Sequence, residues 1–143
     1  MKVKIVSALI LSILFGCASN DLAIAPAEGI LNKPATGRED QSIIYEISAD
    51  ENLTIHVVKI EEARCPSDVQ CIWQGYVKVT FQIGDVSEVE LITPKFAGSN
   101  ISENYEFASG GRNYKLTLKN VTPYPTTKNF EEAKSVEFVL ELL

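Results

Sequence analysis

In this 143-residue chain, the three cysteines are the residues whose possible chemistry is most limited by their positions. Cys17 follows an apolar stretch near the N-terminus, whereas Cys65 and Cys71 lie six positions apart in a largely polar segment. A cysteine thiol can be alkylated, can bind a metal ion, or can be oxidised to a disulfide. The compartment decides between these outcomes, and the residues before Cys17 indicate the compartment.

The first 16 residues have the three parts of an export signal. Two lysines precede an apolar stretch over residues 5–15, which is shorter than the ~20 residues that span a bilayer. Residues 14–17 (Leu-Phe-Gly-Cys) resemble the bacterial lipobox, in which a lipid is attached to the cysteine before the preceding bond is cut. We therefore predict a lipoprotein signal peptide over residues 1–16 and a lipid on Cys17, whose two or three acyl chains would anchor stably.

Export would place the other two thiols in an oxidising compartment, where a disulfide between Cys65 and Cys71 is the default expectation. The enclosed loop is short, so the bridge adds only about 2 kcal/mol of chain-entropy stabilisation and mainly shapes the loop. Trp73 is expected to face inward on the following strand, supporting the loop without contacting a ligand. The candidate binding residues of this loop are Arg64, Pro66, Ser67, Asp68 and Gln70.

The run Arg-Cys-Pro-x-Asp-Val-x-Cys-x-Trp-x-Gly, at residues 64–75, resembles the signature of a family of small bacterial lipoproteins of uncharacterised function. Members of that family resemble this chain in having a lipobox leader, an all-β domain and a late Pro-x-Pro segment, here residues 123–125. The resemblance implies a location and a fold, and it transfers no functional residues.

The sequence does not favour catalysis or metal binding. His56 is the single histidine and falls on the outward side of a strand, and five residues separate Cys65 from Cys71. Zinc sites take about four ligands, often with two to four residues between paired cysteines. We find no EF-hand pattern, no Gly-x-Ser-x-Gly turn and no glycine-rich phosphate loop. We therefore predict no enzymatic activity, no metal and no cofactor.

A second resemblance concerns residues 108–114 (Ala-Ser-Gly-Gly-Arg-Asn-Tyr). They resemble the Ala-Ser-Gly-x-x-Tyr stretch of periplasmic lipoprotein inhibitors of C-type lysozyme, whose serine-bearing loop enters the enzyme's cleft. The spacing here is one residue longer, and a Gly-Gly hairpin turn is the alternative interpretation. The resemblance implies a candidate inhibitory loop made of Ser109, Gly110, Arg112 and Tyr114.

Net charge limits the class of partner. Without the two leader lysines the chain has 11 basic residues against 19 acidic ones, which is a net charge of −8. Nucleic-acid binding depends on clustered Lys and Arg, so we expect no nucleic-acid partner. The same balance argues against polybasic attraction to anionic lipid, and it predicts a domain that stands off from the membrane surface.

Composition and periodicity divide the chain after the leader into two parts. Residues 17–41 hold Ala, Pro, Gly and Asn without a sustained period, and are predicted to be the lipidated cysteine and a flexible tether. Residues 42–143 alternate apolar and polar side chains in short segments, and are predicted to form one β domain. The clearest strand covers residues 73–83 and leads through a Gly84-Asp85 turn into a second strand. A phase slip at Val57 and Val58 predicts a β-bulge.

Six or seven such strands favour an all-β fold, an antiparallel β-sandwich that is Ig-like or similar, with a small β-barrel as the alternative. Ala18, not aspartate, follows Cys17, which favours an outer-membrane lipoprotein on the periplasmic face or cell surface. We expect a non-enzymatic binding or structural module, held to the membrane through Cys17, with an unknown protein or glycan partner. An inhibitor of a cell-wall-degrading enzyme such as C-type lysozyme, or an enzyme with an unrecognised site, are the alternative hypotheses.

Overall fold

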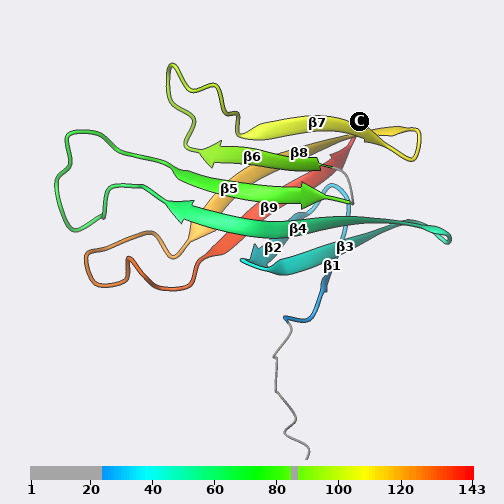
Figure 1. Ribbon diagram of the computed structural model, residues 1–143, viewed down its shortest axis with the longest axis horizontal. Coiled ribbons are helices and arrows are strands. Elements are labelled where there is room, and N and C mark those ends of the chain that lie inside the picture. Colours follow the sequence, from blue (N-terminus) through cyan, green and yellow to red (C-terminus); the bar gives the residue numbers. More distant parts are fainter. Residues whose placement is uncertain (1–23, 85–86) are drawn as a thin grey trace, which may run out of the picture.

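The computed structural model describes residues 24–84 and 87–143, where nine strands form two sheets packed face to face (Figure 1). The five-stranded sheet has the order β1-β3-β4-β5-β6, and the four-stranded sheet has the order β2-β9-β8-β7. The predicted signal peptide (1–16) and Cys17 lie outside the described residues. The strands are β1 (Ala27–Gly29), β2 (Pro34–Arg38), β3 (Gln41–Ser48), β4 (Glu51–Glu62), β5 (Val77–Ile83), β6 (Ser87–Thr93), β7 (Asn104–Ser109), β8 (Arg112–Thr122) and β9 (Ser135–Leu142).

Alternation along the strands creates the core between the sheets. Every second side chain of β5 is buried while its neighbours are partly exposed, and β8 repeats this pattern up to its bulge. Phe81 of β5 meets Phe138 of β9 with ring centroids 5.1 Å apart, so the two inner faces interlock. Over the residues described, the sheets do not close into a barrel, and the predicted β-sandwich is confirmed.

Two local predictions are also confirmed. The register between β4 and β5 shifts between Val57 and Lys59, where the phase slip predicts a bulge. Strands β5 and β6 pair antiparallel, as expected for a hairpin, although Asp85 of the predicted turn is outside the described residues.

The expected boundary between tether and domain is wrong, because strands begin well before residue 42. β1 pairs parallel with β3, and β2 pairs antiparallel with β9. Both strands contain a glycine that lies against the core: a Cβ on Gly29 would come within 2.5 Å of the Tyr45 ring, and one on Gly37 within 2.8 Å of Ile43. Each of these segments becomes an edge strand of one sheet through backbone hydrogen bonds, with its glycine close to core side chains. Hydrophobic periodicity does not reveal pairing of this kind.

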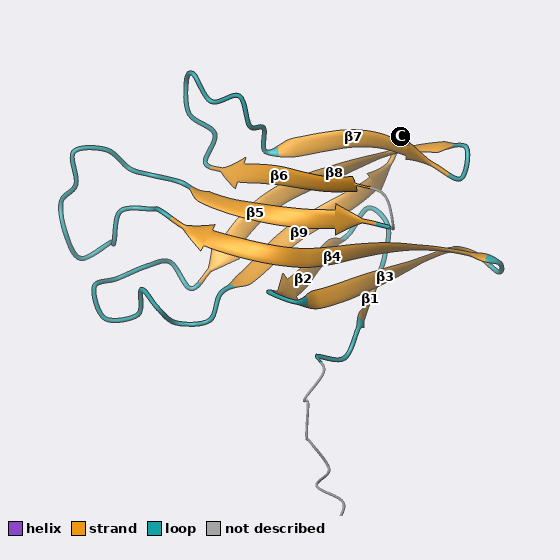
Figure 2. Cartoon of the chain, viewed as in Figure 1, coloured by secondary structure: helices purple, strands orange, loops and turns teal. Residues whose placement is uncertain are grey.

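The two ends of the sandwich differ in the length of their connections (Figure 2). Three long loops lie at one end, here called the loop end: residues 63–76, 94–103 and 123–134. At the opposite end, here called the turn end, short turns join β3 to β4 and β7 to β8. None of the residues placed in the structure belongs to a helix with the length and hydropathy of a membrane span.

Candidate functional site

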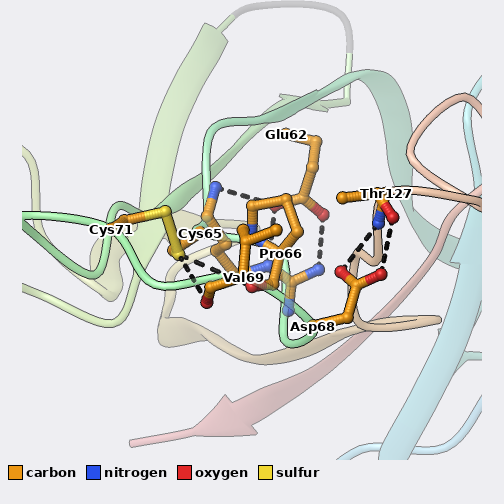
Figure 3. Close-up of a disulfide and its surroundings, with 8 residues drawn as sticks. Glu62, Cys65, Pro66, Asp68, Val69, Cys71 and Thr127 are labelled. Carbon is orange, nitrogen blue, oxygen red and sulfur yellow. Dashed lines mark hydrogen bonds and ion pairs between the residues drawn. A yellow bond between two sulfur atoms is a disulfide. The ribbon is translucent and has the colours of Figure 1, made fainter.

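The predicted disulfide is present and closes the first long loop (Figure 3). Cys65 and Cys71 have Cα atoms 6.0 Å apart, and the loop runs from the end of β4 to the start of β5. Its base continues the pairing of these strands, because the Ala63 amide donates to the Tyr76 carbonyl at 2.9 Å and the Cys65 amide to the Gln74 carbonyl at 2.8 Å. The loop is therefore an extension of the β4–β5 pair.

Gly75 explains how the chain returns from this loop into β5. Its φ of +73° lies in the left-handed region, and a Cβ there would be 1.9 Å from the carbonyl oxygen of Ala63. Only glycine fits this backbone without moving the opposite side of the loop. The glycine at the end of the motif over residues 64–75 is therefore required by the local backbone conformation.

Arg64, predicted to be a binding residue, instead lies inside the protein. Its guanidinium pairs with both carboxylate oxygens of Glu62, and its Nη1 donates to the Val121 carbonyl of the other sheet at 2.9 Å. The guanidinium carbon also lies 4.5 Å from the centroid of the Tyr124 ring. Both charged side chains are more than nine-tenths buried. Pairing within the fold is what allows this cation to be buried, and it leaves Arg64 unavailable to a ligand.

Asp68 joins the first long loop to the third (Figure 3). Its carboxylate accepts hydrogen bonds from the Thr127 amide at 2.9 Å and the Thr127 hydroxyl at 2.6 Å. The hydroxyl bond, more than the amide bond, lowers the pKa of Asp68 below its ordinary value. The Ser67 amide donates to the Pro125 carbonyl at 2.9 Å. Of the five predicted binding residues, Ser67 and Asp68 therefore fix loop position, Pro66 is half-buried and Gln70 is exposed.

Trp73 does not face inward, and this expectation is wrong. Its side chain is 55 % exposed, because β5 starts only at Val77 and the turn at Gly75 interrupts the alternation between them. The indole packs edge-on against Phe96 of the second loop, with centroids 5.5 Å apart, and both rings contact Tyr76. These three rings connect the first and second loops.

A group of apolar side chains around this ring cluster faces solvent. Ile72, next to Trp73 in the chain, is fully exposed, and Val69 and Phe96 are exposed by more than a third. We call Val69, Ile72, Trp73 and Phe96 the aromatic patch. Sequence periodicity does not predict this patch. It places Val69 and Ile72 in a loop and Trp73 on the inward face of a strand, and Phe96 lies on a separate loop. The one available signal was apolar residues placed in loops that should be polar.

The loop end has almost no net charge although the protein is acidic. The three loops contain four basic and four acidic residues, so the acidic excess of the chain lies outside them. These residues are Arg64, Asp68, Lys95, Glu103, Lys128, Glu131, Glu132 and Lys134. Arg64 is paired with Glu62 at the end of β4, and counting that partner leaves one net negative charge.

A groove of about 630 Å³ shows where the N-terminal segment joins the domain. Ile24, the first described residue, lines it together with Ile60, Glu62 and Phe130. Glu62 ends β4 and Phe130 lies on the third loop, so the chain enters the domain beside the loop end.

The predicted inhibitory loop lies at the turn end and is a tight hairpin. Ser109 pairs with Arg112, Arg112 forms an ion pair with Glu51 at 3.0 Å, and Gly110 lies directly over that carboxylate. Tyr114 is fully buried in β8 and cannot contact a partner, which corrects its assignment to a recognition loop. The alternative interpretation, a Gly-Gly turn before a strand, is the observed structure.

His56 is partly buried on β4, where its Nδ1 lies 3.0 Å from the Ser42 hydroxyl. Within residues 24–84 and 87–143, no three side chains of His, Cys, Asp or Glu gather as metal ligands. Comparisons with protein-family models, with curated proteins and with solved structures return no match to this chain.

Proposed function

We propose that this protein is a lipid-anchored, non-enzymatic binding module of the outer membrane that makes its contacts through the aromatic patch. The observation that carries the proposal is the exposure of Ile72 and Trp73 on a loop whose base is held rigidly. Folded proteins seldom leave neighbouring large apolar side chains in water unless a partner covers them. Trp and other aromatic residues are also the side chains that dominate binding energy at interfaces.

The contacts beneath the patch support binding without large rearrangement. The Cys65–Cys71 disulfide, the buried Arg64–Glu62 pair and the Asp68–Thr127 hydrogen bonds hold the first loop at three points. A surface that is already ordered loses less conformational entropy when a partner covers it. Loops at one end of a sandwich are also a frequent place for recognition.

The chemistry of the patch fits binding better than catalysis. Val, Ile, Trp and Phe side chains carry no group that transfers protons at neutral pH or attacks an electrophile. The lipobox-like sequence before Cys17 supports the membrane anchor, since a multiply acylated cysteine would keep the domain at a bilayer.

Site-specific crosslinking tests the use of the patch. A photo-crosslinking amino acid is placed at Ile72 in the intact membrane-bound protein, and in a control at Ile30, which is exposed outside the three loops. We expect covalent adducts from position 72 and none from position 30 after illumination of native membranes. Equal adduct yields at the two positions, or no adduct at position 72, would contradict the proposal.

Mass spectrometry of the purified protein tests the anchor separately. We expect an N-terminal Cys17 carrying thioether-linked lipid. An unmodified Cys17, or a disulfide from Cys17 to Cys65 or Cys71, would contradict the predicted anchor.

A further inference from the structure

We propose that the surface covering the aromatic patch is the lipid bilayer that holds the protein's own anchor. This inference rests on the proposed function, because it assumes a lipid on Cys17 and a contact made through the patch. It replaces the expectation from net charge that the domain stands off from the membrane.

The first argument is the short connection between anchor and fold. Seven Cα-to-Cα steps separate Cys17 from Ile24, and a fully extended chain covers at most about 25 Å over seven steps. Ile24 lies in the groove with Phe130, beside the loop end. Ile24 is therefore confined to within about 25 Å of the lipid attachment point, which keeps the domain next to the bilayer.

The second argument is the position of Ile24 along the sandwich. Ala27 of β1 pairs with Ile43, which pairs with Ile55 of β4. Ile55 is four residues, about 13 Å, from Glu51 at the turn end, and Ile24 precedes Ala27 by three residues, about 10 Å. The connection is therefore long enough for either end or the side of the domain to meet the bilayer, and surface chemistry decides between them.

The third argument is the chemistry of the surfaces that can reach the bilayer. The loop end carries Ile72, Trp73 and Phe96, which are residue types that enter the headgroup and acyl boundary of a bilayer. Ile72 and Trp73 are adjacent in the chain, and Phe96 packs against the indole, so one shallow insertion would cover all three. At the turn end, the exposed large apolar residues include the adjacent Leu142 and Leu143, which have no aromatic ring.

Charge selects the same face. Anionic lipid repels an acidic protein, and the net charge of −8 lies entirely outside the three loops. The loop end can therefore approach a bilayer at a smaller electrostatic cost than the rest of the domain. This commits the inference to apolar insertion and predicts little dependence on anionic lipid content.

Trp73 is the only tryptophan of the chain and reports directly on its own surroundings. The intact lipidated protein is reconstituted in phosphatidylcholine vesicles, with and without bromine on the lipid acyl chains. We expect Trp73 emission to be at least twofold lower in brominated vesicles than in unbrominated vesicles. We also expect aqueous iodide to quench Trp73 at least threefold less in vesicles than in the lipid-free Cys17→Ser chain in solution.

Two matched variants sharpen this measurement, because both stay anchored through Cys17. Ile72→Asp places a charge on a fully exposed position of the patch, and Ile30→Asp places one on an exposed position outside it. We expect Ile72→Asp to abolish quenching by brominated lipid and Ile30→Asp to retain it, with unchanged circular dichroism for both.

The outcomes separate this inference from the proposed function. Quenching by brominated lipid that is lost only in Ile72→Asp supports the bilayer as occupant. Trp73 that stays open to iodide and unaffected by bromine overturns it. If that result accompanies position-specific adducts from residue 72 to a protein or glycan in native membranes, the bilayer inference fails while the proposed binding function stands.

Discussion

Each end of the sandwich has one arginine–glutamate pair, and the two pairs differ mainly in burial. At the loop end the side chains of Arg64 and Glu62 are 3 % and 7 % exposed. At the turn end those of Arg112 and Glu51 are 41 % and 34 % exposed. An exposed pair contributes little because water competes for both charges, whereas a broken buried pair leaves one charge without solvent or partner. The same two residue types therefore have different roles at the two ends.

The connections explain why the loop end needs the buried pair. At the turn end, strands are joined by tight turns, and the ladder hydrogen bonds extend almost to the turn itself. The long loops have few ladder bonds, so side chains must hold them: Arg64 reaches the Val121 carbonyl of the opposite sheet and Asp68 reaches Thr127. Order at the loop end thus depends on a few specific contacts between segments far apart in the sequence.

Removing the arginine at each end should give the largest difference in stability between the two ends. Arg64→Ala leaves the Glu62 carboxylate buried and unpaired, and we expect a loss of about 3–5 kcal/mol in the free energy of unfolding. Arg112→Ala at the turn end should cost about 1 kcal/mol or less. Urea unfolding followed by circular dichroism measures both. Similar losses for the two variants would show that burial does not separate the pairs.

Two glycines with positive φ allow a second comparison, within the loop end. Gly75→Ala brings a Cβ against the Ala63 carbonyl in addition to its φ of +73°, and we expect a loss of about 2–3 kcal/mol. Gly98, with a φ of +86°, has open space around its Cβ position, so Gly98→Ala should cost only about 1 kcal/mol. Thermal unfolding of both variants measures the difference, and equal shifts would mean that the close approach at Gly75 relaxes without cost.

Opening the disulfide should affect only one end. Cys65→Ser combined with Cys71→Ser removes a short covalent loop, and we expect a loss of about 2 kcal/mol with cooperative unfolding retained. Hydrogen exchange should accelerate in residues 63–76 and stay unchanged at the β7–β8 turn. Faster exchange at both ends would argue that the disulfide stabilises the whole sandwich.

The smallest expected effect concerns a core tyrosine on the turn-end half of β3. Burial raises the pKa of Tyr45 to about 12, and its hydroxyl has no hydrogen-bond partner among the described residues. Folding therefore favours the neutral phenol, so the associated stability is complete below pH ~10 and is lost as the pH rises toward 12. Tyr45→Phe should flatten this alkaline loss, by no more than about 1 kcal/mol, in urea titrations at pH 9 and 11. The disulfide variant should show the same alkaline slope as the wild-type chain, since the two regions are separate.

Periodicity within a strand was sufficient to predict much of the fold. The alternation in β5 and β8, the bulge at Val57 and the antiparallel sandwich follow from which side chains must leave water. β1 and β2 were missed because they are short and contain Pro or Gly, and they join the sheets by backbone pairing. For the site, the export signal and the number of cysteines predicted the disulfide, but the direction of individual side chains was not predictable.

Arg64 and Trp73 show where the sequence stops being informative. The sequence by itself determined the alternating faces and the location of a loop between two strands, because these depend on neighbours within about ten residues. It also predicted the oxidised cysteine pair, because the export signal implies an oxidising compartment. Only the tertiary structure decided that the arginine is buried and the tryptophan exposed. Arg64 is held by Val121 and Tyr124, and Trp73 packs on Phe96, partners that local periodicity cannot identify. Burial is a property of contacts between distant segments, and those contacts form only when the two sheets and three loops come together.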